Sequence, residues 1–491
     1  MRSISNYQLT IDNNQAPIPH PKSRISNPRS HIPQIILLLC LSLLLAGCSP
    51  QYLSDEQIVQ RIFGPKVRAQ YNSISLNLHC PANLGPLANG CRQVSKRIKN
   101  LGFFGQGRVV GIYCPPMGFC QLSDTLSPEI GKLTRLKLLQ ISNHNLTMLP
   151  PEIGELTELH GLFLDGNNLT SLPPEIGRLT KLQLLSVRDN ELTGLPPEIG
   201  HLTMLRGLYI QNNNLANLPP EIGQLTNLYE VHASNNYLSD IPPEIGQLTR
   251  MRTLLFDHND LTGLPPEIGR LTNLRMVNLS YNALQTLPSE MGQLANLLRF
   301  DLKENRLSSP PPVLWQLTNL QFLSLNSNGI ATLPPDVGQL AHLKRLELHD
   351  NALTALPPAI GRLQELGGIA LSRNQLATLP PEIGRLARLH ELSLNDNALT
   401  RLPPEIGQLR HLNGLYLSHN ALTMLPPEIG QLIELTDIDL RDNALTALPP
   451  EMEQLIHLER LWLSGNPLLP LPPEVAQLPK LEFLDLEEQV Q

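Results

Sequence analysis

Residues 149–171, "LPPEIGELTELHGLFLDGNNLTS", decide the fold of this chain, because their pattern recurs through most of the 491-residue sequence. Related segments start at residue 127 and at every twenty-third residue up to 472, without an insertion or deletion, which makes sixteen units over residues 127–491. A fixed period of this length is typical of a solenoid, in which each unit packs against its neighbours along the chain.

The leucines of one unit alternate as they do in a short β-strand. Leu162 and Leu164 lie two residues apart, so an extended chain points both to one side, and Gly161, Phe163 and Asp165 face the other. A single unit cannot bury its leucine side alone, whereas stacked units bury it between them. We therefore expect one parallel β-sheet that takes a strand from every unit.

The PPEIG segment of each unit predicts a short helical or 3₁₀ turn on the side opposite the strand. Proline is tolerated in the first turn of a helix, and Glu152 lies near the positive end of that turn. Ile153 and Leu156 are then expected to point inward.

A column of asparagines marks the end of each strand. Asn167 recurs at the equivalent position in fourteen units, with His144 in the first unit and Gln489 in the last. An amide carries both donors and acceptors. The column is therefore predicted to satisfy the backbone groups that remain unpaired where every strand turns at the same place.

The core of the unit, L-x-x-L-x-L-x-x-N-x-L, resembles the leucine-rich-repeat family over about three quarters of the chain. The resemblance implies an α/β solenoid, a horseshoe with a parallel β-sheet on its concave face and short helical or 3₁₀ turns on its convex face. The Pro-Pro-Glu-Ile-Gly form is similar to the intracellular Ras-group repeats of plants and animals and to repeats of many bacterial proteins.

The sequence before the repeats resembles a bacterial lipoprotein leader. The apolar run over residues 35–45 would rise about 16 Å as a helix, too short for a hydrocarbon core of about 30 Å. The segment LAGC at 45–48 resembles a lipobox, which implies removal of residues 1–47 and a lipid on Cys48. We therefore expect a bacterial cell-envelope protein facing the periplasm or the medium, with Ser49 favouring the outer membrane.

A linker and a cap are expected between the leader and the repeats. Residues 48–79 are interpreted as a lipid-anchored linker with a short helix, and residues 80–126 as an N-terminal cap in which residues 109–113 form a strand. "GRVVGIYC", residues 107–114, resembles the amino-terminal cap of secreted leucine-rich-repeat proteins.

Four cysteines fall in or near this cap: Cys80, Cys91, Cys114 and Cys120. Their spacing lacks the C-x-x-C pairs of structural zinc sites, so disulfides are favoured over metal. Three pairings remain open, and we expect the local one, which joins the first cysteine to the second and the third to the fourth.

Composition and motifs argue against catalysis and against nucleic-acid binding. The net charge is −7 and no basic run is present, so nucleic acid is not an expected partner. No H-E-x-x-H, G-x-S-x-G, Walker or kinase motif occurs, and the chain as printed stops within the last repeat. We therefore expect no enzymatic activity, no cofactor, no metal and no catalytic domain after the repeats.

The candidate ligand-binding residues are those that vary on the predicted concave face. Aromatic side chains exposed on a rigid curved sheet are suited to anchoring a protein partner. Asp437 and Asp439 lie two residues apart in an acid-rich segment near the C-terminal end of the repeats, and we interpret them as solvated edge residues rather than as an acid/base pair. The candidates are Phe163, Tyr209, Tyr281, Phe322, Tyr416, Trp462, Asp437 and Asp439.

The sequence thus predicts a lipid-anchored, monomeric, non-enzymatic protein that binds a protein ligand or a surface glycan on its concave face. The repeat subclass favours a different reading, an intracellular or host-delivered signalling scaffold that binds small GTPases or kinases. The lipoprotein-like leader favours the lipid-anchored envelope protein, because the repeats alone are compatible with both the cell envelope and an intracellular location.

Overall fold

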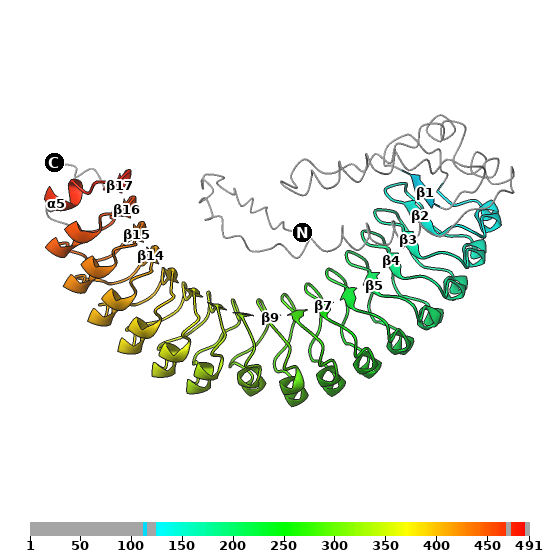
Figure 1. The fold of residues 1–491 in the computed structure, drawn as a ribbon, viewed down its shortest axis with the longest axis horizontal. Helices are drawn as coiled ribbons and strands as arrows, with labels where there is room; N and C mark the ends of the chain where they lie inside the picture. Colours follow the sequence, from blue (N-terminus) through cyan, green and yellow to red (C-terminus); the bar gives the residue numbers. More distant parts are fainter. Residues whose placement is uncertain (1–110, 115–123, 468–472, 487–491) are drawn as a thin grey trace, which may run out of the picture. The chain divides into compact units, whose positions relative to one another are not determined.

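The computed structural model describes residues 111–114, 124–467 and 473–486, all of which belong to one compact unit. In this part of the chain, 17 parallel strands form one sheet, and each strand pairs with the strand before it in the sequence. The strands line the inner side of an arc and short helical turns line its outer side (Figure 1). The predicted leucine-rich-repeat solenoid, with its concave sheet and convex 3₁₀ turns, is therefore confirmed.

Most strands are three residues long and occupy the same position in every unit. The predicted strand over residues 109–113 overlaps β1, which the structure describes over Gly111–Cys114. The strands are β1 (Gly111–Cys114), β2 (Leu138–Ile141), β3 (Gly161–Phe163), β4 (Leu184–Ser186), β5 (Gly207–Tyr209), β6 (Glu230–His232), β7 (Thr253–Leu255), β8 (Met276–Asn278), β9 (Arg299–Asp301), β10 (Phe322–Ser324), β11 (Arg345–Glu347), β12 (Gly368–Ala370), β13 (Glu391–Ser393), β14 (Gly414–Tyr416), β15 (Asp437–Asp439), β16 (Arg460–Trp462) and β17 (Phe483–Asp485).

The outer turns are five-residue 3₁₀ helices, except for the four-residue α-helix α5. They are η2 (Pro128–Lys132), η3 (Pro151–Glu155), η4 (Pro174–Arg178), η5 (Pro197–His201), η6 (Pro220–Gln224), η7 (Pro243–Gln247), η8 (Pro266–Arg270), η9 (Ser289–Gln293), η10 (Pro312–Gln316), η11 (Pro335–Gln339), η12 (Pro358–Arg362), η13 (Pro381–Arg385), η14 (Pro404–Gln408), η15 (Pro427–Gln431), η16 (Pro450–Gln454) and α5 (Pro473–Ala476).

The glycine of each PPEIG segment lets neighbouring turns lie against each other. In η3, a Cβ placed on Gly154 would lie 2.6 Å from the carbonyl oxygen of Glu175 in the next turn. Side chains do not tolerate so close an approach to backbone, so glycine is required wherever the turns stack this tightly.

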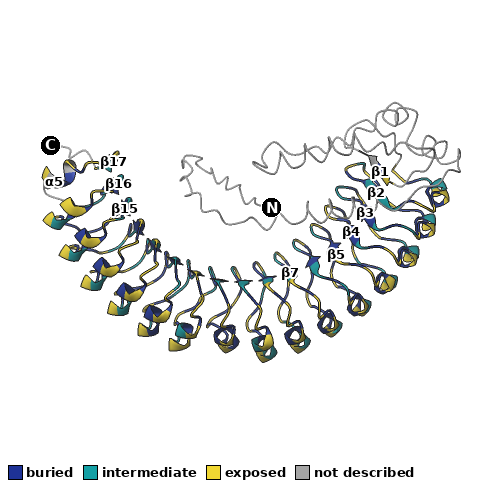
Figure 2. Cartoon of the chain, in the orientation of Figure 1, coloured by how far each residue is buried: buried dark blue, intermediate teal, exposed yellow. Residues whose placement is uncertain are grey.

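A continuous apolar core fills the space between the sheet and the turns. Ile153, Leu156, Leu159 and Leu162 are all fully buried, as the repeat pattern predicts. The same inward positions are buried in unit after unit (Figure 2). Since burial of one leucine or isoleucine side chain contributes about 1.5–3 kcal/mol, the stacked core supplies most of the stabilisation of this fold.

Several predictions from the first 126 residues fall outside the described residues. Cys48, Cys80, Cys91 and Cys120 are among them, and Cys114 is described through its backbone alone, at the end of β1. The lipid site, the disulfides and the boundaries of the linker and cap therefore stay predictions.

Candidate ligand-binding face

The asparagine column fixes the loop that follows each strand. The amide nitrogen of Asn259 donates to the carbonyl oxygens of Ala233 and Phe256, both at 3.0 Å, and its amide oxygen accepts from the N–H of Leu238 at 3.0 Å. The side chain thus joins its own unit to the preceding one, and the predicted role of the column is confirmed.

The residue before each column asparagine adopts a left-handed backbone. His258 and Tyr281 both have φ of 54°, although left-handed φ is uncommon for residues other than glycine, asparagine and aspartate. The flanking hydrogen-bonded loop imposes this conformation, so a bulky side chain at the position is held in a defined place beside the concave face.

Three predicted aromatic anchors lie flat on glycines instead of projecting outward. Phe163 and Tyr209 are 8% and 7% exposed, so the expectation that they are exposed is wrong. The reason is a glycine two residues earlier: a Cβ on Gly161 would lie 2.9 Å from the ring of Phe163, and Gly207 leaves the same room for Tyr209. Tyr416 lies over Gly414 in the same way and is half-buried.

Tyr209 takes part in a polar cluster on the same face. Its hydroxyl donates to Glu230 at 2.5 Å, and its ring meets the His232 ring edge-on with centroids 4.9 Å apart. Burial, reinforced by the charge of Glu230, raises the pKa of Tyr209 above its ordinary value. A phenol held protonated in this way is a structural hydrogen-bond donor rather than a nucleophile.

A more accessible cluster lies at the centre of the sheet. Tyr281 is 37% exposed and its ring stacks on His258 with centroids 4.1 Å apart, while the Lys303 ammonium lies 5.0 Å from the same ring. One strand further, the Arg299 guanidinium lies 3.7 Å above the ring of Phe322. Such contacts combine apolar surface with positive charge, a combination that suits recognition of a protein partner.

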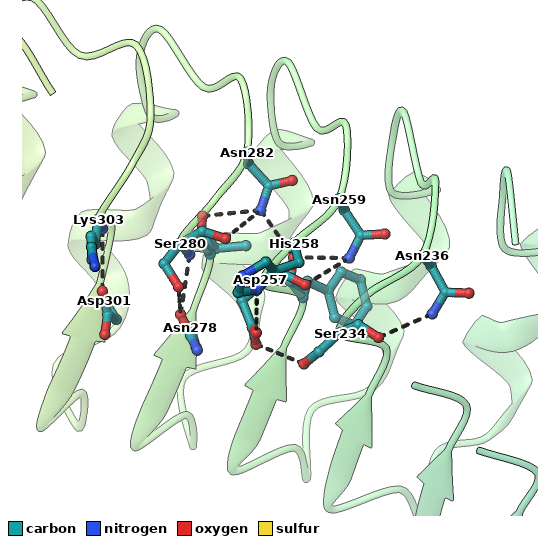
Figure 3. Close-up of polar contacts among 12 residues, drawn as sticks. Ser234, Asn236, Asp257, His258, Asn259, Asn278, Ser280, Asn282, Asp301 and Lys303 are labelled. Carbon is teal, nitrogen blue, oxygen red and sulfur yellow. Dashed lines mark hydrogen bonds and ion pairs between the residues drawn. The ribbon is translucent and has the colours of Figure 1, made fainter. Parts of the chain in front are cut away.

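Hydrogen bonds hold the polar residues below this cluster. Asp257 accepts from the Ser234 hydroxyl at 2.6 Å, and Asp301 accepts from the backbone N–H of Lys303 at 3.2 Å (Figure 3). Burial raises the pKa of Asp301 above its ordinary value. These carboxylates are engaged by hydrogen bonds within the sheet.

The two candidate carboxylates near the C-terminal end of the sheet are not solvated edge residues. Asp437 and Asp439 are 6% and 4% exposed, and each binds a guanidinium, Arg460 in the first case and Arg441, at 2.7 Å, in the second. The interpretation from sequence is therefore wrong. The strand brings the two carboxylates onto one face, where the buried carboxylates require cationic partners.

Trp462 borders these ion pairs. Its ring lies 5.6 Å from that of Phe483, and the guanidinium groups of Arg441 and Arg460 both lie 6.0 Å from its centroid. Burial and the nearby Asp437 charge raise the pKa of Tyr416 to about 12 in the same region. The predicted candidates are thus distributed over strands β3 to β16 rather than gathered in one pocket.

The outer side has a pocket that the sequence reading did not single out. Trp315 occupies the position that is glycine in most turns, and a pocket of about 470 Å³ lies beside it, between η10 and η11. Its lining includes Pro312, Gln316 and Asp336. The signal was visible in the sequence, because PPVLW at 311–315 replaces the usual PPEIG.

The described residues carry neither a metal-binding group nor a membrane-spanning helix. Among them, no group of three or more histidine, cysteine or acidic side chains is placed to hold a metal ion. No helix within the described ranges is long and apolar enough to cross a membrane. The chemistry of the concave face consists of stacked rings, cations and paired carboxylates.

The family described as "Leucine-rich repeat region" matches residues 96–192 and 311–398, and two further leucine-rich-repeat families match residues 272–330 and 457–478. No curated protein matches the chain.

Solved structures with the same architecture come from bacteria and plants. A leucine-rich-repeat protein of Leptospira interrogans is 41% identical over 76% of this chain and 95% of its own, with a TM-score of 0.70. The plant peptide hormone receptor RGFR1, solved with RGF2, is 32% identical over 75% of this chain and 62% of its own, with a TM-score of 0.65. The PEPR1–AtPEP1 complex matches at 27% identity and a TM-score of 0.57 over 77% of this chain and 58% of its own.

The register of the repeats, the asparagine column and the likeness to the Leptospira protein agree with one another: the chain belongs to the leucine-rich-repeat family.

Proposed function

We propose that this protein is a non-enzymatic receptor or adaptor that binds a protein or peptide ligand on the concave face of its sheet. The observation that carries the proposal is the central cluster, in which Tyr281 and Phe322 are backed by His258, Lys303 and Arg299. Partly exposed rings held by stacked neighbours lose little conformational entropy on binding, which favours them as anchors.

Two of the plant relatives support a peptide or protein ligand over a glycan. Both were solved as complexes, RGFR1 with RGF2 and PEPR1 with AtPEP1. The concave sheet of this chain carries aromatic and charged side chains at the variable positions, which is the composition that protein interfaces favour in their centres.

Site-specific photo-crosslinking tests the proposal. Benzoylphenylalanine in place of Tyr281 or Phe322 in the full chain is expected to capture one discrete partner from an extract of the source organism, identified by mass spectrometry. The matched control places the same group at Tyr237, which is 59% exposed and lies outside the concave strands. Equal capture from Tyr237, or none from the concave positions, would contradict a concave binding site.

We further propose that Cys48 carries a lipid that anchors the protein to the bacterial envelope, on the strength of the LAGC segment at 45–48. Radiolabelled palmitate is expected to enter the wild-type protein and not the Cys48→Ser variant. Absence of label from the wild type would remove the anchor and favour the intracellular scaffold instead.

A further inference from the structure

The residue before each strand belongs to a column that runs along one side of the arc. The N–H of Tyr229 donates to the carbonyl oxygen of Arg206 at 2.8 Å, and the N–H of Arg252 donates to that of Tyr229 at 2.7 Å. The same bond joins Arg275 to Arg252 and Leu298 to Arg275, each at 2.9 Å. Because the strands are parallel, their first residues meet at one edge of the sheet, so the column lies beside the concave face and not on it.

The segments that lead into strands β5 to β9 contain arginines and no acid. We call these segments together the basic side; they are residues 203–206, 226–229, 249–252, 272–275 and 295–298. The arginines of the basic side are all exposed, and they are Arg206, Arg250, Arg252 and Arg275. Two of them follow from the column, and the period of 23 residues brings the segments together although no basic run occurs in the sequence.

The groups that contact these arginines are neutral. Arg250 donates to the side-chain oxygen of Asn227 at 2.5 Å, and the Arg252 guanidinium lies 5.5 Å from the centroid of the Tyr229 ring. Among the described residues from 203 to 298, the charged contacts within 4.0 Å join histidines to acids of the concave side and involve none of the four arginines. The basic side therefore carries four positive charges that no ion pair offsets.

The opposite side of the arc does not share this charge. It consists of the segments that follow the column asparagines of the same units, 214–217, 237–240, 260–263, 283–286 and 306–309, and its charged residues are Asp240, Asp260 and Arg306. The other acids of these units lie on the concave side, as Glu230 does, or in the outer turns, as Glu244 does. Since the whole chain has a net charge of −7, the basic side is a local reversal of charge.

We propose that the basic side rests on an anionic phospholipid surface. Its arginines lie at one edge of the sheet, so a flat layer of lipid phosphates can meet them together. The column from Arg206 to Leu298 takes four strand-to-strand steps of about 4.8 Å and so spans about 19 Å. Each cation near an anionic membrane surface strengthens binding about fivefold, which makes four arginines a substantial attraction.

Apolar side chains between the arginines favour a lipid surface over nucleic acid. Met204 is 44% exposed, and Tyr229 and Leu298 are partly exposed on the same side. Tyrosine combines an apolar ring with a polar hydroxyl and is enriched where membranes meet water. Proteins that bind single-stranded nucleic acid instead use rows of aromatic rings on which bases stack, and the basic side has one such ring, beside Arg252.

This mode of attachment is compatible with a ligand on the concave face. Because the strands begin at the basic side, the sheet would stand upright on the membrane and its concave face would stay open. The inference depends neither on the concave ligand nor on a lipid at Cys48, since the arginines attract lipid phosphates in either case.

Co-sedimentation of the full chain with vesicles tests the inference. Vesicles of equal parts phosphatidylglycerol and phosphatidylcholine are expected to bind more protein than pure phosphatidylcholine vesicles, and the difference should shrink as salt rises. Arg206→Gln with Arg275→Gln is expected to weaken binding to the anionic vesicles about twentyfold, and Arg206→Lys with Arg275→Lys to retain it. The charge-matched control is Arg306→Gln with Arg401→Gln, at exposed positions on the opposite side, which leaves binding unchanged.

Three results would overturn the inference: equal binding to the neutral and anionic vesicles, equal loss in the two glutamine double variants, or no loss in either. Tighter binding of duplex DNA than of anionic vesicles at the same phosphate concentration would also overturn it, by reassigning the basic side to nucleic acid. The leader is common to all variants, so its contribution cancels in each comparison. Unchanged circular dichroism melting of the double variants shows that the comparison concerns folded protein.

Discussion

Neighbouring asparagines of the column share carbonyl oxygens, so their replacement is predicted to be non-additive. The Phe256 carbonyl accepts from Asn259 and also from Asn282, each at 3.0 Å. The next carbonyl in the column, that of Leu279, is shared by Asn282 and Asn305 in the same way. Removal of one asparagine therefore leaves each carbonyl with one donor, whereas removal of two neighbours leaves one carbonyl with none.

The magnitude follows from counting the groups that lose their partners. In Asn259→Ala, the N–H of Leu238 loses its acceptor while buried, which costs about 1–3 kcal/mol, and two shared hydrogen bonds worth about 0.5–1.5 kcal/mol each are also lost. The single variant is thus predicted to lose about 2–6 kcal/mol. Adding Asn282→Ala leaves the Phe256 carbonyl without these side-chain donors, which adds a coupling of about 1–3 kcal/mol beyond the sum of the single effects.

The assay is a double-mutant cycle measured by urea unfolding, with hydrogen exchange at the Leu238 amide as a local readout. A solenoid unfolds in segments, so the local amide reports the loss even where the global transition is broad. The matched comparison pairs Asn259→Ala with Asn305→Ala, which share no carbonyl and should be additive within about 0.5 kcal/mol. Asn214→Ala, at an exposed position, is the neutral control.

Additivity in the Asn259 and Asn282 cycle would refute the shared-carbonyl reasoning. If the free energy of unfolding of Asn259→Ala lies within about 0.5 kcal/mol of the wild-type value, the structural role of the asparagine column is refuted as well. Such a result would mean that water replaces the amide at no cost. Asn259→Asp provides a separate check, because it keeps the acceptor for Leu238 and turns an ionised oxygen toward two carbonyl oxygens; its loss of stability should diminish when acid protonates the carboxylate.

Gly207→Ala places a Cβ 2.9 Å from Leu184 and 3.0 Å from the Tyr209 ring, so the variant should lose about 1–3 kcal/mol of stability in thermal melting. The Tyr209 phenol should also become more accessible to solvent, which ultraviolet difference spectra measure. Burial raises the pKa of Asp301, so its ionisation costs stability at high pH and costs nothing below the unfolded-state pKa of about 3.9. Asp301→Asn should therefore raise the free energy of unfolding at pH 7, and the gain should disappear near pH 3, as measured by urea titration. An equal gain at the two pH values would argue against a cost of burying the Asp301 charge. Trp315→Gly restores the common residue of the turn but removes a side chain that is 5% exposed, so a loss of about 3 kcal/mol is expected, and a gain in melting temperature would show that the indole is merely tolerated.

The parts of the fold that repeat could be predicted from the sequence because each residue type has one role per unit. Ile153 and Leu156 are buried as expected, and the asparagines bind the loop backbone. The exposure of Phe163 and Tyr209 was not predictable from strand alternation alone, because alternation gives the face and not the orientation of the ring. The missing signal was the glycine two residues before each ring, which leaves space for the ring to lie on the sheet.

The state of the acidic residues required contacts between units. Asp437 binds Arg460, which lies 23 residues later and so occupies the same position in the next unit. Opposite charges 23 residues apart are candidates for an inter-repeat ion pair, and this spacing would have indicated the pairing of Asp437 with Arg460. The central cluster is harder to predict, because it depends on the left-handed backbone of His258 and Tyr281, which the sequence does not show for residues of this size.

The separation of the core from the variable face explains how the side chains of the concave face can differ from strand to strand without a change of fold. Inward leucines supply the stability, and the loop asparagines set the geometry, so the first and third residues of each strand are free to vary. The C-terminal strands use that freedom for internal ion pairs, which contribute little net stability once desolvation is counted. In the middle strands, Arg299 lies over Phe322 and Lys303 lies near Tyr281, and the carboxylate of Asp301 lies close to both cations. Because none of these contacts is needed for folding, the rings and charges of the concave face can change from unit to unit while the core that stacks the units stays the same.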